Sequence, residues 1–181
     1  MPRPAKPKLP VNKTLISEVL QRASNAKTKS EKVRILVEYK SPALTKLLLC
    51  NFSDNIRFMF PTGKTPYTPQ DRPKGVDHSF LFNEHRHIER FIKKRVNGVV
   101  YYGDSGGTRP RLPQIKKEQL WVQLLENLHP EEADVLDLTK DKKLTTRFKI
   151  TKQNVIDAFP ELNLTPSTQG NGPNQTENTT E

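Results

Sequence analysis

The sequence has few of the residues that stabilise secreted, zinc-binding or membrane-spanning proteins. It contains one cysteine, Cys50, which excludes an internal disulfide framework and any zinc site built from several cysteines. Its longest strongly apolar run is Leu47-Leu48-Leu49-Cys50, far shorter than a membrane-spanning helix requires. The N-terminal residues also lack the apolar segment of a secretory signal. We therefore expect no membrane partner.

Apolar residues are scarce as well, and their scarcity is concentrated at the two ends of the chain. Hydrophobic residues make up 33% of the 181 residues. Leu, Ile, Val and Phe together still reach 25%, above the level of roughly 20% below which disorder is expected. Residues 1–13 hold four prolines, and residues 165–181 hold no apolar residue. We predict a globular domain at 14–160, between a basic, Pro-rich disordered arm (1–13) and a polar, acidic disordered tail (161–181).

The pattern of apolar residues in the central domain is that of amphipathic helices. A spacing of three to four residues predicts a mainly α fold, a single compact helical domain. Thr28, Ser41 and Thr151 have the positions of N-caps, and Pro42 and Pro130 those of first helical residues. The helices are expected at about 14–27, 29–40, 42–52, 78–95, 113–128, from 130 and at 152–159. A Pro-rich loop at 61–76 and a small hairpin or surface loop at 96–112 complete the prediction.

The positive charge is distributed unevenly along the chain. The formal net charge is +10, with +7 in residues 1–40 and +3 in each of the segments 41–76 and 77–112. Residues 113–160 are neutral, and residues 161–181 carry −3. Such asymmetry indicates a polyanionic partner for the basic part, although a solvated, solubilising surface is the alternative.

The strongest candidate for a binding site is a basic segment followed by aromatic residues. On the predicted helix 78–95, cations spaced by three and four residues would share a face, and tyrosines follow at once. Such a helix could place its cations along a phosphate backbone while the tyrosines stack on bases. The candidate residues of the segment are Arg86, Arg90, Lys93, Lys94, Arg95, Tyr101 and Tyr102. The N-terminal arm adds Arg3, Lys6 and Lys8 as a cationic thread. The alternatives are an ordinary solvated helix face and an unbound tail.

Two short strings resemble catalytic motifs but lack the context that the chemistry needs. Gly103-Asp-Ser-Gly-Gly107 matches the nucleophile string of chymotrypsin-like proteases, yet the chain lacks the strands of their two β-barrels. Gly63-Lys64-Thr65 resembles the end of a P-loop, but Pro66 follows at once where a helix should begin. Both strings are typical of turns, and we predict no catalytic residue and no enzyme activity.

The histidines do not form a metal site on the predicted helix. His78 and His85 would share a face but lie about 10 Å apart along the helix axis. His85 and His87 would point in different directions. The sequence therefore predicts no metal and no cofactor.

Several phrases of the sequence resemble a family of small proteins encoded by T-even-like tailed phages of cyanobacteria and marine bacteria. They are Ser41-Pro42-Ala43-Leu44, Pro66-Tyr67-Thr68-Pro69, and Leu124-Leu125-Glu126-Asn127-Leu128-His129 leading into Glu132-Ala133-Asp134-Val135-Leu136. The similarity covers about residues 15–160, and the family has no known function. The resemblance implies a phage protein in the cytoplasm of an infected bacterial host, with the virion as an alternative location. It transfers no site residue.

Two functions remain in competition. The first is a non-enzymatic phage accessory protein that binds the DNA or RNA backbone largely non-specifically, in replication, transcription or packaging. The second is an interaction module for a host or phage protein, or a minor virion component. Its hydrophobic anchors would be Trp121 and the apolar segment Ile56–Phe60, unless these residues belong to the core.

Overall fold

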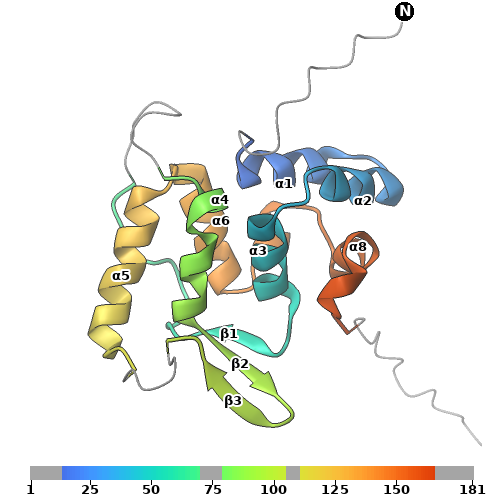
Figure 1. The fold of residues 1–181 in the computed structure, drawn as a ribbon. Coiled ribbons are helices and arrows are strands. Elements are labelled where there is room, and N and C mark those ends of the chain that lie inside the picture. The colour runs from blue at the N-terminus through green and yellow to red at the C-terminus, as the bar shows by residue number, and fades with distance from the viewer. Residues whose placement is uncertain (1–13, 70–78, 105–110, 166–181) are drawn as a thin grey trace, which may run out of the picture.

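The computed structural model describes residues 14–69, 79–104 and 111–165, and these form a mainly helical domain with one small sheet (Figure 1). The predicted fold class is thus confirmed. The helices are α1 (Ile16–Asn25), α2 (Lys29–Glu38), α3 (Pro42–Phe52), α4 (Leu81–Glu84), α5 (Gln114–Asn127), α6 (Pro130–Lys140), α7 (Leu144–Arg147) and α8 (Lys152–Ala158). Two 3₁₀ helices are η1 (His85–Phe91) and η2 (Pro160–Leu162). The strands are β1 (Ile56–Phe58), β2 (Ile92–Val96) and β3 (Val99–Tyr102).

The expected N-caps are present. The Ser41 hydroxyl accepts a hydrogen bond from the Leu44 amide at 3.2 Å, with Pro42 as the first residue of α3. Thr28 caps α2 in the same way, and Thr151 caps α8. Each cap satisfies an amide that the helix itself leaves without a partner. These local signals explain why the starts of the helices could be read from the sequence.

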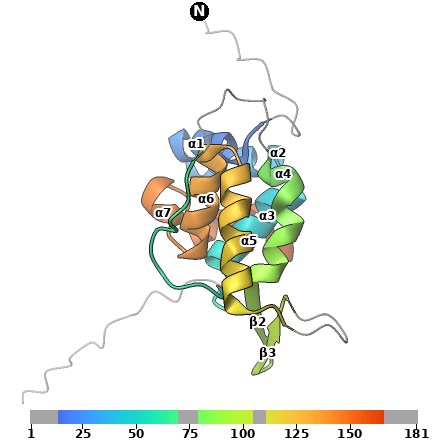
Figure 2. The same ribbon diagram turned by 90° about the vertical axis from the view of Figure 1, so that its left-hand side faces the viewer.

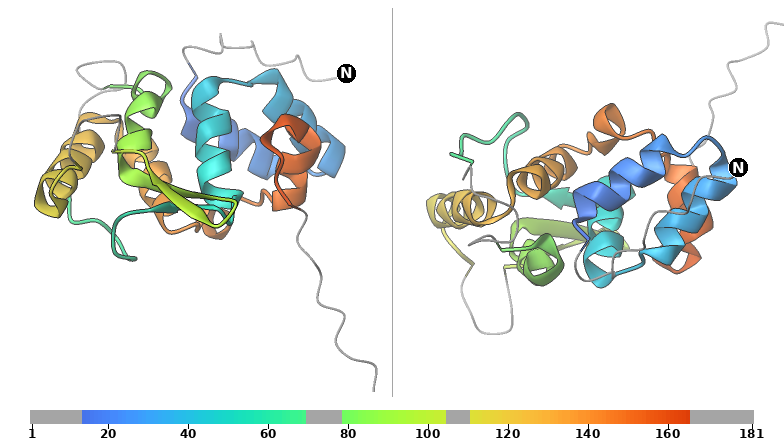
Figure 3. Two further views of the ribbon diagram at one scale, coloured as in Figure 1. Left: turned by 60° about the horizontal axis from the view of Figure 1, so that its bottom comes forward. Right: turned by 90° about the horizontal axis from the view of Figure 1, so that it is seen from above.

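Helix α3 occupies the middle of the core. It packs against α6 on one side and against α4 and η1 on another, while α1, α2 and α8 lie together at one end (Figures 1 and 3). Leu44, Leu47 and Leu48 of α3 have no exposed surface. Their spacing of three and four residues places a continuous apolar stripe along α3, which explains its central position.

One carboxylate of α6 links the N-termini of two other helices. Glu132 is buried, and its Oε1 accepts the Ile16 amide at 2.9 Å while its Oε2 accepts the Leu81 amide at 2.7 Å. Ile16 and Leu81 are the first residues of α1 and α4. A negative charge at two helix N-termini satisfies free amides and complements both dipoles. Glu132 therefore fixes how three helices meet.

The loop that follows β1 is fastened to α6. The Thr65 hydroxyl donates to Asp137 at 2.5 Å, Tyr67 donates to Asp134 at 2.9 Å, and the Gly63 amide donates to Asp141 at 2.8 Å. The three acids are spaced by three and four residues and so share one face of the helix. Much of the negative charge of α6 is thus used inside the fold.

The three strands form an antiparallel sheet in the order β1-β2-β3. The predicted helix over 78–95 is confirmed for residues 81–91, which α4 and η1 cover, and wrong from Ile92, where the chain continues as β2. The buried residues of both elements happen to follow a helical spacing. The expected hairpin is present, with Asn97 and Gly98 at φ 49° and 81° in a two-residue turn.

At the C-terminal end, regular structure continues beyond residue 160. η2 follows α8, and Leu162 and Leu164 pack against the core. The residues of the predicted arm, 1–13, and most of the predicted tail lie outside the described residues.

Candidate nucleic-acid interface

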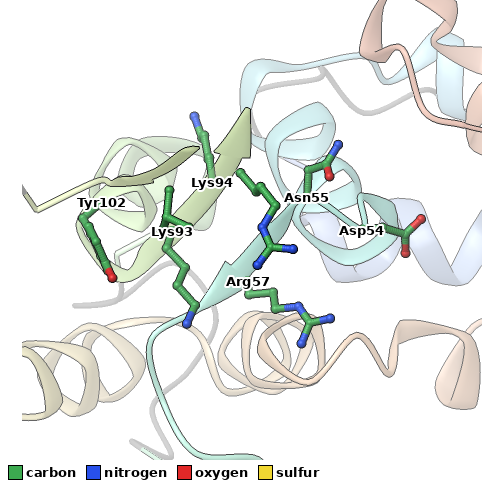
Figure 4. Close-up of a pocket in the computed structure, with 8 residues that line it drawn as sticks. Asp54, Asn55, Arg57, Lys93, Lys94 and Tyr102 are labelled. Atoms are coloured by element: carbon green, nitrogen blue, oxygen red, sulfur yellow. The ribbon is translucent and has the colours of Figure 1, made fainter. Parts of the chain in front are cut away.

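The register of the sheet brings three cations to one face. Arg57 of β1 is paired with Lys93 of β2, and Lys93 is paired with Tyr102 of β3. Directly paired residues point to the same side, as do residues two apart on one strand, so Arg95 joins them. Figure 4 shows the Arg57 and Lys93 side chains extending to the same side of the strands, away from Lys94. We call Arg57, Lys93 and Arg95 the basic sheet face.

The opposite side of the sheet is anchored in the core. Ile56, Phe58 and Ile92 are buried there, and the Phe58 ring lies 5.5 Å from that of Trp121. The Phe91 ring meets Trp121 edge-on at 5.3 Å. This aromatic packing holds the backbone of β1 and β2, and with it the points from which the three cationic side chains extend.

A pocket of about 280 Å³ opens on the basic sheet face. It is lined by Asp54, Asn55, Arg57, Lys93, Lys94, Arg95, Val100 and Tyr102. The one carboxylate among these residues, Asp54, accepts a hydrogen bond from Lys152 at 2.9 Å. That bond, together with the charges of Lys152, Lys142 and Arg57, lowers the pKa of Asp54. The carboxylate is thus shared by several cations, and the pocket keeps an excess of positive charge.

The three cations differ from other basic residues of the domain. Within the described residues, Arg57, Lys93 and Arg95 make no hydrogen bond or ion pair with a carboxylate. All three side chains belong to exposed residues. By contrast, Lys117 pairs with Asp104 at 3.2 Å and Lys140 with Asp141 at 2.6 Å. The basic sheet face is therefore one place where positive charge remains available to an external anion.

The edge of this face is closed by a stacked arginine. The Arg111 guanidinium lies 3.6 Å from the centroid of the Tyr102 ring, a close cation–π contact. Arg111 also lies 3.7 Å from Asp104, whose carboxylate is fully buried beside Lys117. One side of the Tyr102 ring is thus already covered.

The other face of the outer sheet has a different character. Lys94 points away from Lys93 and pairs with Glu89 at 3.1 Å, and Glu89 also binds Lys46. Burial and the neighbouring charge of Lys94 lower the pKa of Lys46. Tyr101, the partner of Lys94 on β3, shares this face and is largely exposed.

The structure separates the residues that the sequence placed on one helix. It brings Lys93, Arg95 and Tyr102 together, whereas Lys94 and Tyr101 lie on the opposite face. Arg86 and Arg90 are exposed on η1, where the Arg86 Nε donates to the Asn83 carbonyl at 3.3 Å. The proposed helical alignment of the cations is therefore wrong, because the helical period ends at Phe91. Arg3, Lys6 and Lys8 lie outside the described residues.

Sequence reasoning missed Arg57. The segment Ile56-Arg57-Phe58 alternates buried, exposed and buried residues, a pattern typical of a strand with one solvated face. That alternation could have indicated a cation on the outer face of a sheet. Its relation to Lys93 depends on pairing between strands far apart in the sequence and could not be read locally.

The motif-like strings behave as parts of loops where they are described. Lys64 is exposed in an irregular loop with no helix after it, and Ser105 lies outside the described residues. His85 contacts the Phe82 carbonyl at 2.7 Å, and His87 lies 3.5 Å from Glu84. In the three described ranges, no group of three or more histidine, cysteine or acidic residues could hold a metal ion. The Cys50 thiol is buried, which raises its pKa to about 11.

Trp121 does not serve as an exposed anchor. It is 2% exposed, and its indole nitrogen donates to the Thr65 hydroxyl at 3.1 Å beneath the loop. Ile56 is also buried. Both residues belong to the core, so the anchors expected of an interaction module are largely internal.

Comparison with known proteins identifies the family. Residues 19–146 match the model described as "Family of unknown function (DUF6433)", and the chain belongs to this family. No curated protein and no solved structure matches the chain. Among the described helices, none combines the length and apolar character needed to cross a membrane.

Proposed function

We propose that the protein binds nucleic acid through the basic sheet face, largely without sequence specificity and without catalysing a reaction. The observation that carries the proposal is the set of three exposed cations, Arg57, Lys93 and Arg95, on one rigid face without a carboxylate partner among the described residues.

The spacing of these cations suits a phosphate backbone. Lys93 and Arg95 are two residues apart on one strand, which separates their Cα atoms by about 6.6 Å. Arg57 lies on the neighbouring strand, about 5 Å away across the ladder. A chain of phosphates can therefore meet several cations at once, and each contact releases bound counterions.

The net charge of +10 supports the same partner, because it raises the rate and affinity of encounters with any polyanion. The resemblance to tailed-phage proteins supports an accessory role in phage replication, transcription or packaging within the infected host. A protein partner with an acidic surface is the competing proposal, and the exposed cations would serve it equally well.

Salt dependence tests the proposal. The full-length protein is titrated into a fluorescent 24-base-pair duplex and into a single strand at several salt concentrations. Replacing Arg57, Lys93 and Arg95 by alanine should flatten the slope of log affinity against log salt for the duplex by about 2.7. The matched control replaces the exposed cations Lys27, between α1 and α2, Arg34 of α2, and Lys149, whose amide donates to Ser24 of α1 at 2.9 Å. Helices α1 and α2 lie at the other end of the molecule from the sheet (Figure 1).

The control variant loses the same amount of positive charge. If the sheet is the binding site, the control cations do not contact phosphates, and the slope should change by less than about 1 unit. Equal effects of the two variants would reduce the binding to general attraction by net charge. Undetectable binding to either nucleic acid at about 50 mM salt, where phosphate contacts are weakly screened, would overturn the proposal.

A further inference from the structure

The outer part of the β2–β3 hairpin is a two-stranded ribbon. The β1–β2 register ends at Lys94, but the Arg95 amide still donates to the Asn55 carbonyl at 2.8 Å. Beyond Arg95, the strand pairs with β3 alone. From Arg95 to the turn at Asn97 the ribbon extends about 6.6 Å. Figures 1 and 2 show the hairpin reaching below the helices, with its turn directed away from them.

The ribbon exposes an unusual amount of apolar surface. Val96, Val99, Val100 and Tyr101 are exposed by 51%, 54%, 37% and 56%. Among the described residues, these four account for all but two of the large hydrophobic side chains with such exposure. Exposed apolar groups that gather at one place, rather than being scattered singly, indicate a surface that a partner covers.

The charges on the ribbon identify the kind of partner. β3 carries no charged residue, whereas β2 carries Lys93 and Arg95 on one face and Lys94 on the other. The apolar tip is therefore bordered by Lys93 and Arg95 on one face and by Lys94, which also pairs with Glu89, on the other. A complementary partner has negative charge along two rims and an uncharged floor between them.

We infer that the β2–β3 ribbon enters a groove of duplex nucleic acid, with its valine tip against the base edges and its cations on the flanking phosphates. The major groove of B-DNA is about 12 Å wide and 8.5 Å deep, and it admits a two-stranded β-ribbon. The free length of the ribbon is slightly less than that depth. Phosphates form the rims, and the floor offers apolar groups such as the thymine methyl.

The β2–β3 ribbon is poorly suited to binding single-stranded nucleic acid. Proteins that bind single strands provide successive aromatic rings on which unpaired bases stack. Here the two tyrosines lie on opposite faces, and Arg111 covers one side of the Tyr102 ring. The inference rests on the proposed nucleic-acid function and narrows it to duplex.

The test replaces the tip valines while leaving every charge in place. Val96→Ser with Val99→Ser is compared with Val37→Ser with Ile115→Ser, which are exposed by 49% and 71% on α2 and α5, outside the hairpin. Circular dichroism confirms that both variants are folded. The tip variant should bind the duplex about tenfold more weakly, because the two serines would no longer bury apolar surface against it in the complex. The control variant should bind as the wild type does.

The probes distinguish failure of the inference from failure of the proposed function. The salt slope of the tip variant should equal that of the wild type, and single-strand binding should be weaker than duplex binding in both. A tip variant that keeps full duplex affinity and the salt slope overturns the ribbon inference alone. Tighter binding of the wild type to phosphatidylserine vesicles than to duplex would also overturn it, in favour of a membrane surface. Loss of all salt-dependent binding would overturn both.

Discussion

At the scale of single residues, Glu132 has the clearest structural role. From the sequence alone, Glu132 is an acid in the first turn of α6 and is expected only to interact favourably with the dipole of that helix. In the structure it is 1% exposed and accepts the first amides of α1 and α4. The neighbouring Glu131 is exposed, and among the described residues its side chain accepts a hydrogen bond only from the Ser17 hydroxyl, at 3.3 Å. The sequence does not distinguish the two acids, because their difference comes from helices packed far apart in the chain.

Replacing Glu132 by alanine should destabilise the fold by about 3 kcal/mol, since two buried amides lose a charged acceptor. Glu131→Ala should cost less than about 1 kcal/mol, because the Glu131 carboxylate is exposed and its hydrogen bond to Ser17 is long, at 3.3 Å. Urea unfolding followed by circular dichroism at 222 nm measures both values. Similar free energies of unfolding for the two variants would contradict the role assigned to Glu132.

At the scale of elements, local signals were sufficient wherever a helix had its own cap. The starts of α3 and α8 follow from Ser41 and Thr151, whose side chains bond amides three residues ahead. The predicted helix over 78–95 fails from Ile92 because its buried residues fit a helical period although they belong to two elements. β2 is stabilised by its pairing with β1 and β3, and no local pattern in Ile92–Val96 reveals those partners.

The candidate site, too, could be predicted only as far as local sequence patterns allow, because strand pairing cannot be read from them. The basic residues Lys93 and Arg95 were found from composition alone, since they stand in a run of cations. Their separation from Lys94 follows from the two-residue period of a strand and needed only the correct element type. The contribution of Arg57 needed the sheet register as well, which is a property of the folded molecule.

The junction between η1 and the hairpin depends on Gly103. A Cβ at this position would lie 1.7 Å from the Glu89 carbonyl oxygen, and the Gly103 amide donates to Ile92 at 2.9 Å. Gly103→Ala should therefore cost about 1–3 kcal/mol, as overpacking against backbone does. Gly98→Ala is the control for the loss of a glycine without a steric clash. A Cβ at position 98 would have no atom within 4 Å, so only the positive φ of the residue would cause strain.

Urea unfolding gives both values. A Gly103→Ala variant as stable as the wild type would mean that β3 does not end against η1 as described. The folded Gly103→Ala variant should also bind the duplex more weakly. The junction positions β3, whose Tyr102 is paired with Lys93.

At the scale of the whole molecule, the distribution of charge agrees with the arrangement of the elements. The neutral segment 113–160 contains α5 to α8, and several acids of α6 bind the loop at 61–69 rather than facing solvent. The acids on α6 are therefore poorly placed to repel an anion at the sheet. The basic sheet face lies at the end of the domain opposite α1 and α2 (Figure 1). Because residues 1–40 also carry +7, net charge alone does not favour the sheet over the end with α1 and α2. The proposed function relies instead on the arrangement of Arg57, Lys93 and Arg95 on one face.

The most direct test of the nucleic-acid interface is a residue-resolved map of binding. The 20.8-kDa protein, labelled with ¹⁵N, is titrated with a short duplex at low salt while amide chemical shifts are followed. The account predicts that the largest shifts occur in β1, β2 and the hairpin turn, at Arg57, Lys93, Arg95 and Gly98, and that added salt reverses them. Shifts concentrated on α2 and α8, or a spectrum unchanged by duplex, would contradict it.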